Sequence, residues 1–264
     1  MALCVSKLNI VAYLHGGEHN HIISDVSFSV ERGKKLAIVG RSGCGKTMTA
    51  MAILGLLPEN CEAHGSILWE GEELTKISAK RRRELLGREL IYIPQSGADF
   101  LNPSVRIEKQ MDEALCHAGV PKAERAGKMR ELLGKTGLED IERIIKSYPF
   151  QLSGGMAQRV VMAMGSCGEP GLVIADEPTR GIDKENTALF LKNLDAMFSS
   201  SAVLLITHDI SAASSCDEML VMKDGKVIEQ GTSFQILHEP ENEYTHMLIC
   251  DLPHALDHAR KELL

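Results

Sequence analysis

The sequence predicts an α/β fold with a mainly parallel sheet, a small antiparallel β region and a helical subdomain. Apolar segments rich in β-branched residues begin the chain, strand-like and helix-like segments alternate in its second half, and a long helical pattern lies between them. The 264 residues are 44% hydrophobic and 25% charged, enough apolar material for a folded core. We expect a single domain over residues 1–264.

The first half of the chain predicts short strands and one helix that follows a glycine-rich turn. The helix is expected within residues 47–57, because these residues are strong helix formers and Pro58 follows them. The apolar, β-branched segments that predict strands are Leu8–Tyr13, Val26–Val30, Lys35–Val39, Ser66–Trp69 and Leu90–Ile93.

Residues 104–147 show amphipathic spacing and turn signals, so we expect a helical insertion within a subdomain of about residues 96–165. Alternation then returns, and an Asp-Gly pair at Asp224 predicts a hairpin turn before a short C-terminal extension of about residues 232–264. The expected elements of this part are a helix from about Ser153, a strand at Leu172–Ala175, a helix from about Asp183 and a strand at Ala202–Ile206.

Composition excludes several classes of protein. No run approaches the ~18 to 20 apolar residues that span a bilayer, so a membrane role is expected to be peripheral. The N-terminus lacks the pattern of a secretory signal, and seven scattered cysteines without a CxxC pair fit reduced thiols, so we expect a cytosolic chain. The net charge of -7 disfavours a protein that coats nucleic acid, and we interpret Arg81–Arg83 as a solvated helix face.

The most specific motif is a glycine-rich loop between an expected strand and an expected helix. It predicts phosphate binding, because glycines let backbone N–H groups curl around an oxyanion and the helix N-terminus faces the same place. Lys46 adds positive charge, and the Thr47 hydroxyl is a ligand for Mg²⁺. The loop is Gly40-Arg41-Ser42-Gly43-Cys44-Gly45-Lys46-Thr47.

An apolar strand ending in two carboxylates follows later in the chain. Asp176 is suited to the Mg²⁺ shell, and Glu177 is suited to take a proton from an attacking water. An acidic turn after a buried strand is common, so this motif gains its meaning from the preceding phosphate loop.

A third motif, Leu152 to Arg159, resembles the signature of ABC-type ATPases, with Met156 where the family usually has Gln. Ser153 is expected to cap a helix, while Gly154 and Gly155 permit close approach of a phosphate. The resemblance covers about Leu8 to Pro253. It implies a P-loop NTPase core that binds ATP and Mg²⁺ and hydrolyses the nucleotide to ADP and phosphate.

The resemblance also assigns roles to isolated residues that occur in the family order. Gln95 resembles the Q-loop glutamine that senses Mg²⁺ or water and contacts the membrane subunits, and Asp183 resembles the D-loop aspartate. His208 resembles the switch histidine that contacts the γ-phosphate. Tyr13 is the candidate for stacking on adenine, although packing is at least an equal alternative and His19 or His21 is a second candidate.

Within the family, this chain resembles importers of oligopeptides, dipeptides and nickel. The segments that carry this likeness are Leu101-Asn102-Pro103, Tyr148-Pro149-Phe150 before Met156, and residues 240–246. Arg180, Gly181 and Ile182 depart from the small or apolar residues usual in the D-loop. The resemblance implies a peripheral subunit at the cytoplasmic face of the inner or plasma membrane, with a second ATPase subunit, two transmembrane permease subunits and, indirectly, a solute-binding protein.

Two rivals are a soluble ABC ATPase that acts on nucleic acid or ribosomes, and a non-hydrolysing regulatory partner. The first usually has coiled coils, tandem ATPase domains or basic surfaces, and the second would lack a hydrolytic residue.

Two further hypotheses concern a reactive thiol and a metal site. Cys44 is either a thiolate favoured by Lys46 and the helix N-terminus or a small residue that fits, and His254 with His258 is either a metal site or a solvated tail.

Overall fold

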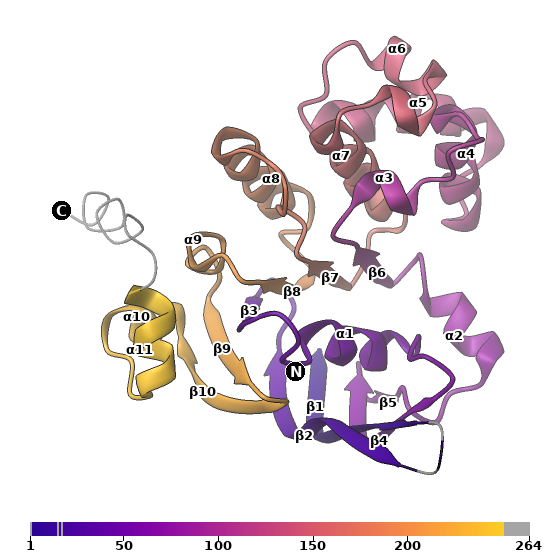
Figure 1. Ribbon diagram of the computed structural model, residues 1–264. Helices are drawn as coiled ribbons and strands as arrows, with labels where there is room; N and C mark the ends of the chain where they lie inside the picture. The colour runs from indigo at the N-terminus through magenta and orange to yellow at the C-terminus, as the bar shows by residue number, and fades with distance from the viewer. Residues whose placement is uncertain (1, 15, 17, 251–264) are drawn as a thin grey trace. The chain divides into compact units, whose positions relative to one another are not determined.

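The computed structural model describes residues 2–14, 16 and 18–250. They form two compact units (Figure 1). Unit 1 is built from the described residues of Met1–Val30, Lys35–Thr75 and Leu205–Leu264, and unit 2 from Glu31–Lys34 and Lys76–Leu204.

Unit 1 holds the glycine-rich loop and most of the strands. Its elements are β1 (Leu3–Tyr13), β2 (His19–Val30), β3 (Lys35–Val39), α1 (Lys46–Leu54), β4 (Cys61–Trp69), β5 (Glu72–Glu73), the end of β8 (Ala202–Thr207), α9 (Ile210–Ala213), β9 (Glu218–Lys223), β10 (Lys226–Thr232), α10 (Ser233–His238) and α11 (Glu243–Cys250).

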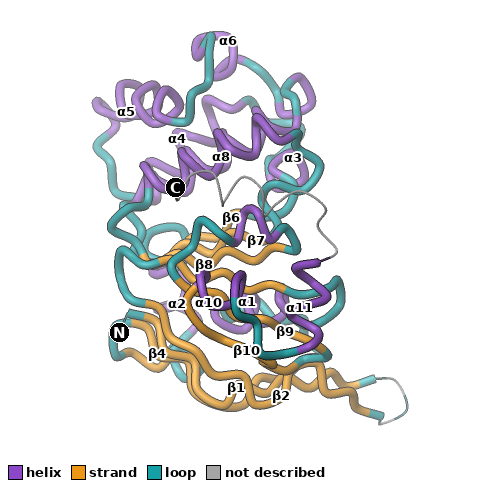
Figure 2. The backbone as a smooth tube through the Cα atoms, turned by 90° about the vertical axis from the view of Figure 1, so that its left-hand side faces the viewer, coloured by secondary structure: helices purple, strands orange, loops and turns teal. Residues whose placement is uncertain are grey.

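The small antiparallel β region is a four-stranded sheet in the order β2-β1-β4-β5, whose long strands run side by side in Figure 2. Strands β1, β2 and β4 begin earlier than their apolar segments predict. In β2, His19, Asn20 and His21 are exposed but pair in register with β1. Polar residues give no alternation signal, so pairing with a neighbouring strand extends the element where local pattern does not.

The second sheet of unit 1 has the order β10-β9-β3-β8, and β3 and β9 are parallel. Strands β9 and β10 form the predicted hairpin, with Asp224 at φ 48° and Gly225 at φ 76° in the turn. Both values suit the Asp-Gly turn that matches strand twist. Helix α1 ends at Leu54, before the predicted boundary, because Gly55 adopts a left-handed conformation with φ 67°.

Unit 2 combines two parallel strands with a group of helices. Its elements are α2 (Ala79–Leu85), β6 (Leu90–Ile93), α3 (Gly97–Phe100), α4 (Ile107–His117), α5 (Lys122–Lys135), α6 (Ile141–Lys146), η1 (Pro149–Gln151), α7 (Gly154–Gly165), η2 (Ser166–Gly168), β7 (Leu172–Asp176), α8 (Lys184–Met197) and the start of β8.

The strand order in unit 2 is β8-β7-β6, and β6 and β7 are parallel. Every residue of β7 and β8 is buried, as expected for central strands covered on both faces. Helices α3 to α7 gather into one lobe (Figure 1), which confirms the predicted helical insertion. The mixed α/β class with parallel and antiparallel sheets is therefore as predicted.

No helix within the described residues has both the length and the apolar content needed to cross a membrane.

Candidate functional site

The glycine-rich loop in unit 1 links β3 to α1, and its glycines are required by its shape. A Cβ on Gly40 would lie 2.3 Å from the Met222 carbonyl oxygen, and a Cβ on Gly45 would lie 2.3 Å from Ile23 Cδ1. Gly43 faces open space, but its φ of 84° favours glycine. The loop can therefore take this path only with glycine at these positions.

The loop delivers the N-terminus of α1 in a form suited to an anion. Gly45 caps the helix without a side chain, so no side chain of the cap covers the first N–H groups. Lys46 is buried, and its Nζ donates to the carbonyl oxygens of Gly40 at 2.7 Å and Arg41 at 3.2 Å. Thr47 is exposed at the start of the helix. Helix N–H groups and a lysine at one loop can bind a phosphoryl group.

The hypothesis that Cys44 is a reactive thiolate is wrong. Burial raises the pKa of the Cys44 thiol, and this outweighs the opposing effect of Lys46. The side chain is 6% exposed. Cys44 is therefore a small residue that fits the loop, and the sequence expectation underestimated desolvation because the packing around the loop is not local.

Helix α11 contacts the loop through a residue that had no assigned role in the sequence. The buried Tyr244 hydroxyl accepts a hydrogen bond from the Arg41 N–H at 3.3 Å. The Arg41 guanidinium lies 5.9 Å and the Lys223 ammonium 5.0 Å from the centroid of the Tyr244 ring. A buried ring with two cations nearby ties the C-terminal helix to the loop.

In unit 2, the two carboxylates lie at the end of β7 as predicted. Asp176 is buried and accepts a hydrogen bond from the Tyr92 hydroxyl at 3.1 Å. Burial, with the charge of Asp176, raises the pKa of Tyr92 above its usual value, so this hydroxyl stays a donor. Glu177 is half-buried with φ 47°, a left-handed conformation that is uncommon outside glycine and that clusters at functional sites.

Gln95 lies in a loop that is held against α7. Buried Gln158, on α7, donates to the Pro94 carbonyl oxygen at 2.8 Å. A Cβ on Gly97 would lie 2.6 Å from the Gln158 backbone nitrogen, so the start of α3, directly after this loop, touches α7. Gln158 had no predicted role. The available sequence signal was its place as a polar residue beside Ala157, Val160 and Val161, which are all buried.

The segment at Ser153 has the predicted cap. The Ser153 hydroxyl accepts from the Met156 N–H at 3.3 Å, at the N-terminus of α7. A Cβ on Gly154 would meet nothing within 4 Å, and a Cβ on Gly155 would lie 3.9 Å from Ile182. The surface beside Gly154 is thus open, which leaves room for another molecule to approach the helix start.

Asp183 caps α8, and Arg180, shortly before it in the chain, contacts Gln95. The Asp183 carboxylate accepts from the Asn186 N–H at 2.9 Å and the Asn186 Nδ2 at 2.7 Å, capping α8. The hydrogen bond from the Asn186 N–H holds the pKa of Asp183 below its usual value. With the Gln95 amide oriented so that its oxygen faces Arg180, that oxygen accepts from Arg180 Nη1 at 2.7 Å and Nε at 3.1 Å.

Two more predicted residues lie in unit 1. His208 is exposed directly after β8, and Asp209 caps the N-terminus of α9. Tyr13 is 46% exposed, and its hydroxyl donates to a Glu62 carboxylate oxygen at 3.1 Å, which raises its pKa. His19 pairs in register with Tyr13, so both adenine candidates lie on neighbouring strands.

The three predicted Mg²⁺ ligands supply a hydroxyl, an amide oxygen and a carboxylate, from Thr47, Gln95 and Asp176. Hard oxygen donors of this kind fit Mg²⁺. Within the described residues, no group of three or more His, Cys, Asp and Glu side chains forms a metal site. His254 and His258 lie outside the described residues.

Comparison with known proteins supports the order of motifs described above. The model of the family described as ABC transporter matches residues 23–180. The metal-staphylopine import system ATP-binding protein CntD of Staphylococcus aureus is 34% identical over 244 residues, covering 90% of this chain and 89% of that protein. The oligopeptide transport ATP-binding protein OppD of Bacillus subtilis is 36% identical over 266 residues, covering 98% and 74%.

A solved structure described as the ATP binding subunit of an ABC transporter has a TM-score of 0.75 to this chain. It is 26% identical, and the match covers 95% of this chain and 99% of that one. The fold, the order of the motifs and these relatives all point to the same protein family.

Proposed function

This chain belongs to the ABC transporter family, and we propose that it is the ATP-hydrolysing subunit of a membrane importer. The phosphate loop is the main support for this proposal, because its glycines, Lys46 and the start of α1, which no side chain caps, suit the binding of an anion. In this proposal residues 1–264 form one nucleotide-binding domain, with a helical subdomain near 96–165 and a C-terminal extension near 232–264.

The proposed chemistry divides the roles among the site residues. Thr47, Gln95 and Asp176 would hold Mg²⁺, which supplies charge neutralisation at the phosphates. Glu177 accepts a proton from the attacking water, and His208 donates a hydrogen bond to the γ-phosphate. Two hydrogen-bond partners support this arrangement, because half-buried Tyr92 orients Asp176 and buried Gln158 holds the loop of Gln95.

We propose that the subunit acts as half of a head-to-tail pair. ATP lies between residues 40–47 of one subunit and residues 153–155 of the other, with Asp183 at the same junction and Tyr13 stacked on adenine. The exposed Ser153 and the open surface at Gly154 support this use of α7. ATP binding closes the pair and hydrolysis reopens it. A different second ATPase subunit, or a second copy of this chain, completes the pair.

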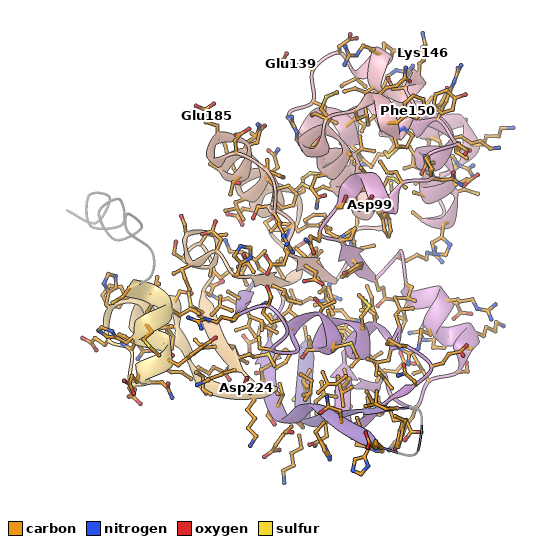
Figure 3. The ribbon with its side chains drawn as sticks, viewed as in Figure 1. Asp99, Glu139, Lys146, Phe150, Glu185 and Asp224 are labelled. Atoms are coloured by element: carbon orange, nitrogen blue, oxygen red, sulfur yellow. The ribbon has the colours of Figure 1, made fainter. Side chains whose placement is uncertain are left out.

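The proposed partners are two transmembrane permease subunits, with a solute-binding protein acting indirectly, at the cytoplasmic face of the inner or plasma membrane. An aromatic surface on unit 2 supports a protein partner. Phe150, labelled in Figure 3, is 74% exposed and stacks on Tyr148 with ring centroids 5.6 Å apart, and the Arg106 guanidinium lies 5.4 Å from the Tyr148 ring centroid. Exposed aromatic and arginine side chains are typical of interfaces.

The proposed cargo is a peptide or a nickel or other metal complex. The names of the two relatives given above refer to metal-staphylopine import and to oligopeptide transport. Tyr148-Pro149-Phe150 before Met156 favours a metal complex slightly, with peptides nearly equal. No observation favours the nucleic-acid alternative.

The first test is Glu177→Gln in the assembled transporter. We expect ATP to bind with unchanged affinity while phosphate release is lost at the site that Glu177 serves, because the substitution removes the base and keeps the size of the side chain. Nucleotide binding and phosphate release are measured side by side. Normal phosphate release from both sites would show that the base is elsewhere.

The second test addresses the cargo. The gene is deleted, and uptake of radioactive nickel and of labelled dipeptides and oligopeptides is followed in parallel, with the intact gene restored as the control. We expect loss of one of these activities. Unchanged uptake of all of them would end the cargo proposal and leave the ATPase proposal untouched.

A further inference from the structure

Arg180 and Gln95 form a forked contact within unit 2. The Gln95 amide oxygen accepts from Arg180 Nη1 at 2.7 Å and from Nε at 3.1 Å. We propose that Arg180 is a positioning residue that occupies the oxygen of Gln95 and so competes with the Mg²⁺ ion for this ligand. This latch rests on the proposed function, since it concerns the metal that accompanies ATP.

The chemistry of the amide makes the two uses of Gln95 compete. An amide oxygen is a compact acceptor with two lone pairs, and two N–H groups of Arg180 converge on it. A bound Mg²⁺ would need a lone pair of the same oxygen. A metal ion and a guanidinium are also both cations, so they repel each other at one oxygen. Gln95 therefore binds the metal only after Arg180 turns away.

The loop around Arg180 is built to let it turn. Arg180 is exposed, so its guanidinium can exchange Gln95 for water. Gly181 follows with φ 76°, and a Cβ there would meet nothing within 4 Å. The Arg180 N–H donates to the Glu177 carbonyl oxygen at 3.1 Å. Movement of this turn thus links the release of Gln95 to the backbone of the proposed base.

The backbone on either side of Gln95 has limited freedom to follow Arg180. The preceding carbonyl, on Pro94, is held by Gln158 at 2.8 Å, and Gly97 lies against α7. The moving part of the latch is therefore the arginine. An arginine at this position is one of the departures of this chain from the small residues usual in the D-loop.

The prediction is that shortening Arg180 tightens metal binding. In the full chain with a non-hydrolysable ATP analogue, Mn²⁺ is the metal used and its affinity is measured by electron paramagnetic resonance. We expect Arg180→Ala and Arg180→Thr to bind Mn²⁺ about tenfold more tightly, from the strength of hydrogen bonds to charged groups. Arg180→Lys keeps the charge but loses the fork, so most of the gain is expected there too.

Two controls separate the latch from general effects. Gln95→Ala removes the competing oxygen, so adding Arg180→Ala to it should give no further gain in Mn²⁺ affinity. Binding of a fluorescent ATP without metal should be equal in all variants, which shows that the phosphate loop remains intact.

The outcomes distinguish the two proposals. If Arg180→Ala and Arg180→Thr bind metal-free nucleotide normally but leave Mn²⁺ affinity unchanged or weaker, the latch is wrong and the proposed function stands. An equal gain in the Gln95→Ala background also overturns the latch, because plain charge repulsion would then explain it. Failure of the unmodified protein to bind any nucleotide overturns the proposed function and the latch with it.

Discussion

Gln158→Met tests whether α7 positions the loop of Gln95. Gln158 is 2% exposed, and its Nε2 donates to the Pro94 carbonyl oxygen at 2.8 Å. Methionine has a similar volume, so the cavity contribution is small. The variant loses one hydrogen bond and leaves a partly buried carbonyl without its donor, which together cost about 1–3 kcal/mol. We therefore expect the free energy of unfolding in urea to fall by that amount.

The loss should also reach the chemistry, because Pro94 precedes the proposed metal ligand. We expect the Mg²⁺ concentration for half-maximal ATP hydrolysis to rise several-fold, by roughly 3–10 times if ~1 kcal/mol of positioning is lost. The assay is a Mg²⁺ titration of phosphate release, normalised to the folded fraction.

Gln110→Met is the matched control. Gln110 is also buried, and it accepts from the Asn102 N–H and donates to the carbonyl oxygens of Asn102 and Val105. This variant should lose at least as much stability while its Mg²⁺ dependence stays normal. A stable Gln158→Met protein, or equal Mg²⁺ shifts in both variants, would refute the positioning argument.

Three further predictions concern single side chains. Tyr244→Phe keeps the ring near Arg41 and Lys223 but removes the acceptor of the Arg41 N–H. Stability should therefore fall by about 0.5–1.5 kcal/mol and ATP affinity should weaken, and unchanged ATP binding in calorimetry would contradict this. Cys44 should react with an alkylating agent far more slowly than exposed Cys116 at neutral pH, and mass spectrometry showing equal rates would count against its burial and raised pKa. Burial raises the pKa of Cys167 from 9.0 to about 12. The unfolded chain therefore releases this proton first, and stability falls as pH rises from about 9 towards about 12. Cys167→Ala should flatten this fall in urea titrations over the same pH range, and parallel curves for the two proteins would exclude this origin.

Contiguous stretches of sequence determined much of the candidate site. Gly43 and Gly45 are favoured by the positive φ of their own backbone, 84° and 102°, and Ser153 caps α7 through an N–H three residues later. The Asp224-Gly225 turn and the end of β7 at Asp176 were predictable for the same reason. In each case the deciding forces act between neighbours in the chain, so a short motif carries them.

The strand boundaries and the side-chain partners were decided by tertiary structure. Strand β2 extends to His19 through pairing with β1, which local polarity conceals. Tyr92 meets Asp176 across 84 positions, and Arg41 meets Tyr244 across 203. The pKa of Cys44 likewise follows from burial by distant residues, which overrides the adjacent Lys46. Burial and hydrogen-bond partners depend on which segments the fold brings together, and no local pattern of residues contains that information.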